Sequence, residues 1–174
     1  TDRGASGRPV SGAEKTAERI APSKGGTGTG MRLVDLVREM EGVIGIQGDP
    51  SVRVTDLSLD SRTVVPGTLF FALPGEQTDG AGFVPDAVAR GAVGVVARRG
   101  AVKAPGCTLV EAEDPRRAMA PMAARFFGHP SRELTLIGVT GTNGKTSFTY
   151  LMESVLVQAG FETGVIGTVN WRYR

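Results

Sequence analysis

The chain has 174 residues, 40% of them hydrophobic and 22% charged, which is the composition of an ordinary globular protein of one or two domains. Residues 1–30 contain five basic and three acidic residues, and the rest of the chain contains fifteen of each, so the net charge of +2 comes from the N-terminal segment. The remainder is neutral and has no basic stripe with interleaved aromatic residues, which argues against a nucleic-acid-binding protein.

Cysteine content and apolar runs limit the compartment. Cys107 is the only cysteine, which excludes a disulfide framework and a cysteine metal site within the chain and fits a reducing, cytoplasmic compartment. No run of 18 apolar residues is present, so we predict no membrane span. Residues 1–30 are rich in small polar and basic residues and lack the apolar segment of a signal peptide. We therefore expect a disordered extension over residues 1–30, with order beginning at Met31, a candidate natural start.

Residues 31–111 alternate between two kinds of apolar periodicity. A short amphipathic helix is predicted around residues 33–40, and a second helix around 83–88 ends at Gly91. Strands are predicted over residues 52–59, 68–73, 92–97 and 108–111. Strands that alternate with helices indicate α/β architecture with a mainly parallel sheet.

A longer helix is predicted after Asp114, which can cap it, with Pro115 at its first position. One face of this helix carries Ala118, Met119, Met122, Ala123, Phe126 and Phe127. A methionine and phenylalanine stripe at this spacing is more often core than cofactor pocket, and we interpret it as core. Pro121 is expected to kink the helix. Residues 128–131 are predicted to form a linker that contains the only histidine, His129, as a surface or hinge residue, and we place a domain boundary near residue 130.

The segment from Gly138 to Thr146 reads G-V-T-G-T-N-G-K-T and is the strongest functional motif in the chain. It lies between a predicted buried strand over residues 134–139 and a predicted helix over 147–159, the context of a phosphate-binding loop. Its backbone N–H groups and the helix N-terminus would bind phosphate oxygens, with Lys145 at the β- and γ-phosphates and the Thr146 hydroxyl on Mg²⁺. The simpler alternative is a tight turn with an incidental lysine. Val139 also occupies a position where the common form of the motif has glycine.

The region after this loop is too short for a complete nucleotide domain. One strand over residues 163–169 is predicted after the helix, and two strands with one helix cannot cover both faces of a parallel sheet. The acidic residue that completes Mg²⁺ binding usually lies on a later strand. We therefore expect a whole first domain and the opening βαβ unit of a second, with Trp171 and Tyr173 exposed or packed against elements that are absent from this chain.

A second, weaker motif is Leu59-Asp60-Ser61-Arg62, which directly follows a predicted strand. Aspartate and serine commonly cap turns, and an arginine here can simply be solvated. Ser61 and Arg62 could instead form an anion site. The spacing alone leaves both interpretations open.

The order of the motifs resembles the Mur ligases, ATP-dependent amide ligases that build the cell-wall peptide. The T-G-T-N-G-K-T loop by itself is shared with the related folylpolyglutamate synthetases. The segments that carry the closer resemblance are L-D-S-R at 59–62, P-G-T-L-F-F-A-L-P-G at 66–75, Q-T-D-G at 77–80 and F-F-G-H-P-S at 126–131. The resemblance runs from Met31 to Val169. Thr142 and the segment G-V-I-G-T at 164–168 favour the branch that adds the third residue of the stem peptide over the branch that adds a D-alanyl-D-alanine dipeptide.

The resemblance implies a small N-terminal α/β domain for a UDP-linked substrate over residues 31–130, followed by the start of a P-loop central ATPase domain, its first βαβ part, over 131–174. The implied contacts with the UDP-N-acetylmuramoyl moiety are Leu59, Ser61, Glu76, Gln77 and Thr78, with Glu76 and Thr78 where the family has histidine and alanine. The implied ATP site is Gly141, Thr142, Asn143, Gly144, Lys145, Thr146 and Ser147, with Thr146 also on magnesium. Ser147 replaces a common threonine and keeps the hydroxyl.

The activity implied by the resemblance is the ATP- and Mg²⁺-dependent addition of diaminopimelate or lysine to UDP-N-acetylmuramoyl-L-alanyl-D-glutamate through an acyl phosphate, in peptidoglycan synthesis. Lys145 and Thr146 would be the catalytic residues, the partners would be small molecules, and the protein would be a monomer. We expect the chain to be a piece of a longer ligase and inactive alone. Two alternatives remain, the dipeptide-adding branch of the family and a non-catalytic UDP-sugar-binding module.

Overall fold

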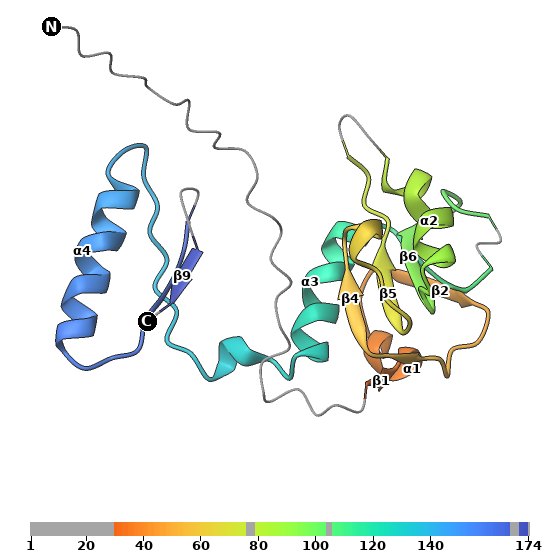
Figure 1. The fold of residues 1–174 in the computed structure, drawn as a ribbon, viewed down its shortest axis with the longest axis horizontal. Helices are drawn as coiled ribbons and strands as arrows, with labels where there is room; N and C mark the ends of the chain where they lie inside the picture. The colour runs from red at the N-terminus through yellow and green to blue at the C-terminus, as the bar shows by residue number, and fades with distance from the viewer. Residues whose placement is uncertain (1–29, 76–78, 104–105, 168–170, 174) are drawn as a thin grey trace, which may run out of the picture. The chain divides into compact units, whose positions relative to one another are not determined.

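The computed structural model describes residues 30–75, 79–103, 106–167 and 171–173, and it divides the chain into two compact units, Thr1–Pro130 and Ser131–Arg174 (Figure 1). We refer to them as unit 1 and unit 2. The expected disordered extension over residues 1–30 lies outside the described residues, apart from Gly30. Three of the expected substrate contacts, Glu76, Gln77 and Thr78, also lie outside them.

Unit 1 is built on a five-stranded sheet in the order β2-β7-β6-β5-β4. Its strands are β2 (Val43–Gln47), β4 (Asp56–Ser58), β5 (Thr68–Phe71), β6 (Gly94–Arg98) and β7 (Thr108–Ala112). The four strands from β4 to β7 are parallel, and the outer strand β2 runs antiparallel to β7. A separate antiparallel pair joins β1 (Met31–Arg32) to β3 (Arg53–Val54). The predicted α/β class with a mainly parallel sheet is confirmed for this unit, whereas β2 was not predicted.

Helices cover both faces of this sheet. On one face, α1 (Leu33–Val37) and α3 (Pro115–Phe126) pack over a core that includes Leu69, Val96 and Val110. On the other face, α2 (Val84–Ala89) packs over Phe70, Val95 and Leu109. Figure 1 shows α2 and α3 on opposite sides of the strands. The alternation of neighbouring strand residues between the two cores is the expected consequence of the strand period of two.

The helix predicted after Asp114 is present as α3, and its cap has the predicted form. The Asp114 carboxylate accepts hydrogen bonds from the backbone N–H groups of Arg116 and Arg117, at 2.9 and 3.4 Å. The predicted apolar stripe is core, because Met122 is fully buried and Met119 packs partly buried against the same cluster. Phe127 lies just beyond the end of the helix, with its ring edge-on to that of Phe126.

The predicted single strand over residues 52–59 is wrong. The structure has two short strands, β3 and β4, of which β3 pairs with β1 and β4 with β5, and the Thr55 N–H between them bonds to the Gly67 carbonyl at 2.9 Å. The predicted alternation also fails at the end of this segment. Ser58 is buried, since its hydroxyl contacts the Asp60 carbonyl and the Thr63 hydroxyl, and Leu59 is 55% exposed.

Unit 2 contains the predicted helix, α4 (Lys145–Gln158), and a hairpin of β8 (Gly164–Ile166) and β9 (Trp171–Tyr173). The predicted buried strand over residues 134–139 is wrong: the described structure has no strand there, and Leu136 is 71% exposed. The expected parallel βαβ arrangement is therefore not formed, and β8 pairs antiparallel with β9. A strand requires a hydrogen-bonding neighbour, and the described residues of this unit provide none for residues 134–139.

The centre of unit 2 is an ion pair instead of an apolar core. Glu153 is its only buried residue among those described, and its carboxylate lies 2.6 Å from the Arg172 guanidinium on β9. The guanidinium also lies 3.9 Å from the centre of the Tyr150 ring. Trp171 and Tyr173 are 75% and 91% exposed, as expected for side chains without a covering layer. Burial of apolar surface therefore contributes little to the stability of this unit.

Met122 provides a test of the core of unit 1. Met122→Ala should lower the free energy of unfolding by about 2–5 kcal/mol, because it opens a cavity under α3. Met119→Ala, one turn earlier and only partly buried, is the matched control and should cost less. Urea unfolding followed by far-ultraviolet circular dichroism measures both. Tryptophan fluorescence is unsuitable, because the only tryptophan is in unit 2. Equal costs at the two positions would contradict this description of the core.

Candidate functional site

The loop before α4 ends in a helix start that is open to a ligand. Gly144 is the N-cap residue, with φ of +75°, a left-handed conformation that glycine adopts without strain. No side chain caps the helix, and its first turn contains no acidic residue. The first N–H groups of a helix have no partner within the helix, and the helix dipole makes this end positive. The N–H groups at the start of α3 are capped by the Asp114 carboxylate. The start of α4 has no such side-chain cap, so its N–H groups are in a position to bind an anion.

Lys145 arches back over this loop. Its Nζ donates a short hydrogen bond to the Gly141 carbonyl and a second, at 3.5 Å, to the Thr142 carbonyl. Gly141 itself has φ of +150°, at the margin of the region that favours glycine. The ammonium group is exposed together with the whole loop, so it can move from these carbonyls to a phosphate without burial of a charge.

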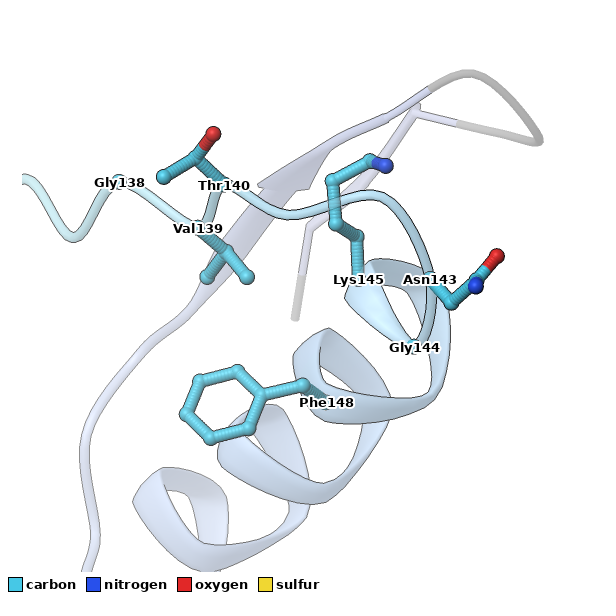
Figure 2. Close-up of a pocket in the computed structure, with 7 residues that line it drawn as sticks. All are labelled: Gly138, Val139, Thr140, Asn143, Gly144, Lys145 and Phe148. Carbon is cyan, nitrogen blue, oxygen red and sulfur yellow. The ribbon is translucent and has the colours of Figure 1, made fainter.

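A groove of about 510 Å³ runs beside the loop and is lined by Gly138, Val139, Thr140, Asn143, Gly144, Lys145 and Phe148. Figure 2 shows Val139 and Phe148 facing the space between the loop and α4, whereas the polar end of Asn143 points outward. Val139, which departs from the common motif, therefore supplies an apolar wall to the groove. Three of the predicted loop residues, Asn143, Gly144 and Lys145, line this groove.

The remaining predicted loop residues lie at the start of α4. Thr146 and Ser147 are both exposed, so their hydroxyl groups are accessible. The described residues contain no group of three or more histidine, cysteine or acidic side chains that could hold a metal ion. A magnesium ion at Thr146 would therefore need its other ligands from phosphate, water or residues that the structure does not describe. A magnesium ion that takes one ligand from the Thr146 hydroxyl and the others from phosphate and water is compatible with these residues.

The second motif, residues 59–62, forms the turn that leaves β4. Asp60 caps η1 (Ser61–Thr63) and accepts a hydrogen bond from the Arg62 N–H at 3.0 Å. The Arg62 guanidinium also turns back onto this carboxylate, with its closest contact, from Nη2, at 2.7 Å. Together these bonds hold the pKa of Asp60 below its usual value. The Arg62 guanidinium is therefore paired with Asp60, and an anion site at Ser61 and Arg62 stays a prediction.

Ser61 and Leu59 have opposite exposures within this turn. Ser61 is buried beside α2. The Ser61 hydroxyl and the Arg90 guanidinium, whose Nε lies 3.0 Å from the Asp86 carboxylate, lower the pKa of Asp86. Leu59 is more than half exposed at the end of the sheet where β4 leaves it. The structure thus brings these two predicted residues into one turn, with an apolar side chain outward and a hydroxyl inward.

One contact near this end of the sheet was missed by sequence reasoning. The Arg116 guanidinium, in the first turn of α3, donates a hydrogen bond to the Pro74 carbonyl at 2.8 Å. Pro74 lies in the segment after β5, 42 residues earlier in the chain. Arg116 and Arg117 can be read from the sequence. A bond from Arg116 to a backbone carbonyl 42 residues earlier in the chain, however, gives no local sequence pattern that could predict it.

Comparison with known proteins shows consistent relationships. Residues 53–127 match the family described as Mur ligase family, catalytic domain. The UDP-N-acetylmuramoyl-L-alanyl-D-glutamate--2,6-diaminopimelate ligase of Caldanaerobacter subterraneus subsp. tengcongensis is 45% identical over 80% of this chain, and that of Alkaliphilus metalliredigens is 42% identical over 81%. This chain covers 29% and 28% of those proteins.

Solved structures agree at the level of the fold. A structure of UDP-N-acetylmuramoyl-L-alanyl-D-glutamate--2,6-diaminopimelate ligase matches 83% of this chain with a TM-score of 0.65 and 24% identity, and the chain covers 29% of it. A crystal structure of MurF from Acinetobacter baumannii matches 76% of this chain with a TM-score of 0.59 and 24% identity, with 29% of that chain covered.

Within the described part of the chain, no helix is long and apolar enough to cross a membrane. The parallel sheet and identities above 40% to curated ligases over four fifths of the chain agree with one another. The chain is thus similar to the Mur ligase family, whose catalytic-domain description matches residues 53–127.

Proposed function

We propose that this chain is part of an ATP-dependent ligase that adds diaminopimelate to UDP-N-acetylmuramoyl-L-alanyl-D-glutamate in peptidoglycan synthesis, the activity given in the names of its curated relatives. The observation that carries the proposal is the uncapped start of α4, with Lys145 beside it, in a chain similar to this family. In this proposal unit 1 would bind the UDP-linked substrate and unit 2 would bind ATP.

The loop from Gly141 to Ser147 supports ATP binding. Its exposed lysine and the unpartnered N–H groups at the start of the helix match the charge and the acceptor oxygens of a triphosphate. Lys145 would move from the Gly141 and Thr142 carbonyls to the β- and γ-phosphates. The Thr146 hydroxyl would hold a magnesium ion, which neutralises phosphate charge when it is bound.

Leu59 and Ser61 support the UDP-linked substrate on unit 1. They lie at the carboxyl end of the parallel strands, the usual ligand-binding edge of an open α/β sheet. The exposed Leu59 side chain offers an apolar surface to a uracil ring, whereas the buried Ser61 hydroxyl would have to turn away from Asp86 to form a hydrogen bond with the substrate. Glu76, Gln77 and Thr78 remain proposed contacts of the same substrate.

The reaction places two demands on the chain. ATP would transfer its γ-phosphoryl group to the free carboxylate of the substrate, and the amine of diaminopimelate would then attack the acyl carbon and release phosphate. Lys145 and the loop N–H groups would position the phosphates and oppose the charge that spreads over them in the transition state. The acyl phosphate must also be shielded from water, which usually requires closure of a further part of the protein.

Lys145→Ala should lower the affinity of this chain for MgATP about tenfold or more, because it removes a charge-assisted contact with the phosphates. In the full-length ligase it should abolish turnover and leave UDP-substrate binding nearly unchanged. Isothermal titration with MgATP and with UDP separates the two. Lys103→Ala, at an exposed lysine of unit 1, is the matched control. Loss of both ligands in the Lys145 variant would contradict the division between the units.

Leu59→Ala tests the site on unit 1. Because Leu59 is 55% exposed, the substitution should change the free energy of unfolding by less than about 0.5 kcal/mol. It should nevertheless weaken UDP binding about fivefold or more through lost apolar contact. Ile44→Ala is the control, since Ile44 is 41% exposed on β2, the strand at the far side of the sheet from β4. Equal effects of the two variants on UDP binding would count against Leu59 as a contact.

The 174-residue chain by itself should have no ligase activity, because it spans less than a third of its relatives and its phosphate loop is exposed. The assay measures ADP release in the presence of UDP-N-acetylmuramoyl-L-alanyl-D-glutamate, diaminopimelate and MgATP. A curated relative of full length serves as the positive control. ADP release that depends on both the UDP substrate and diaminopimelate would overturn this expectation.

A further inference from the structure

The parallel strands of unit 1 bring distant cations to one edge of the sheet. Strands β4, β5, β6 and β7 all end at this edge, because they run in the same direction. The residues that follow them include Leu59 after β4, Pro74 after β5 and Arg116 after β7. Ligands of open α/β sheets bind outside the carboxyl ends of such strands. Any cation fixed at this edge is therefore a candidate ligand for an anionic substrate.

Most of the arginines at this edge are already paired or are not held in place. Arg62 forms an ion pair with Asp60 at 2.7 Å, and Arg117 lies 3.9 Å from Asp114. Arg98, the last residue of β6, is exposed, and its side chain makes no hydrogen bond within the part of the chain that the structure describes. A long side chain that is free to move loses conformational entropy when it binds.

Arg116 differs from these residues because it is fixed and retains its charge. The bond from its Nη2 to the Pro74 carbonyl at 2.8 Å holds the guanidinium against the segment that follows β5. A carbonyl is neutral and takes one of the five N–H donors, so the positive charge and further donors remain for a ligand. Within the described residues no carboxylate lies within ion-pair distance of Arg116, and its side chain is exposed at the surface. This preorganised fork suits phosphate oxygens.

We propose that Arg116 is a substrate-binding residue of unit 1, which donates hydrogen bonds to the diphosphate of the UDP-linked substrate while it holds the segment after β5 in place. The inference rests on the proposed function, which supplies the nucleotide diphosphate. It gives the diphosphate a positive partner on unit 1, where Leu59 and Ser61 can account only for the uridine end.

The test compares two ligands that differ only in the diphosphate. Binding of UDP and of uridine is measured by isothermal titration in the Lys145→Ala background, so that the phosphate loop of unit 2 does not contribute. Arg116→Gln should weaken UDP binding about tenfold or more, as expected for one charge-assisted contact, and leave uridine binding unchanged. Arg117→Gln is the matched control, since its neighbouring guanidinium is 91% exposed, and it should change neither affinity.

The outcomes separate a binding role from a structural one. If Arg116 only holds the segment after β5, then Arg116→Gln will weaken uridine and UDP binding equally, and the proposal is overturned. Unchanged UDP binding overturns it as well. Thermal unfolding of each variant identifies any general loss of structure. If the Lys145→Ala chain binds neither ligand, the proposed substrate site on unit 1 is itself contradicted, which distinguishes that failure from failure of the Arg116 assignment.

Discussion

A parallel sheet must be covered on both faces, and this constraint organises unit 1. Helices α1 and α3 cover one face and α2 covers the other, so residues of β5 such as Leu69 and Phe70 are buried on opposite sides. The same connections force the strands from β4 to β7 to end at one edge. Residues far apart in the chain, such as Leu59 and Arg116, reach that edge only because the crossover helices return each strand in the same direction. The candidate substrate site is thus a direct consequence of how the sheet is covered.

Unit 2 shows what happens when this coverage is missing among the described residues. Its helix α4 forms, because a helix satisfies its own hydrogen bonds, but the apolar side chains of Phe148, Leu151 and Val155 remain substantially exposed. Residues 134–139 form no strand with any of the described residues. The Glu153–Arg172 ion pair includes the one buried side chain of the helix, that of Glu153, among the described residues, and such pairs stabilise little once their desolvation is counted. The chain covers under a third of its curated relatives, which fits a unit whose remaining layers belong to other sequence.

Local patterns predicted the elements that local chemistry determines. The cap at Asp114, the core stripe through Met122 and the helix after Lys145 follow from neighbouring residues, and the structure confirms them. The failures all involve distant partners. The predicted strand over residues 134–139 has no neighbour among the described residues, β3 and β4 pair with different strands, and the Arg116–Pro74 contact joins segments 42 residues apart. Loop composition likewise indicated the loop before α4, whose role in phosphate binding stays a prediction, whereas the burial of Ser61 depends on how η1 meets α2.

The exposure of the phosphate loop sets the strength of its interaction with phosphate. Two unit charges 4 Å apart attract by about 1 kcal/mol in water and by about 4 kcal/mol in the partly screened environment near a protein surface. Lys145 must also give up its bonds to the Gly141 and Thr142 carbonyls, which water can replace at little cost while the loop stays open. An open loop therefore binds phosphate less tightly than a covered one, and the contribution of its lysine increases when further protein covers it. The covering that strengthens this charge interaction is the same covering that would protect an acyl phosphate from water, so nucleotide affinity and protection of the intermediate should appear together in the complete ligase.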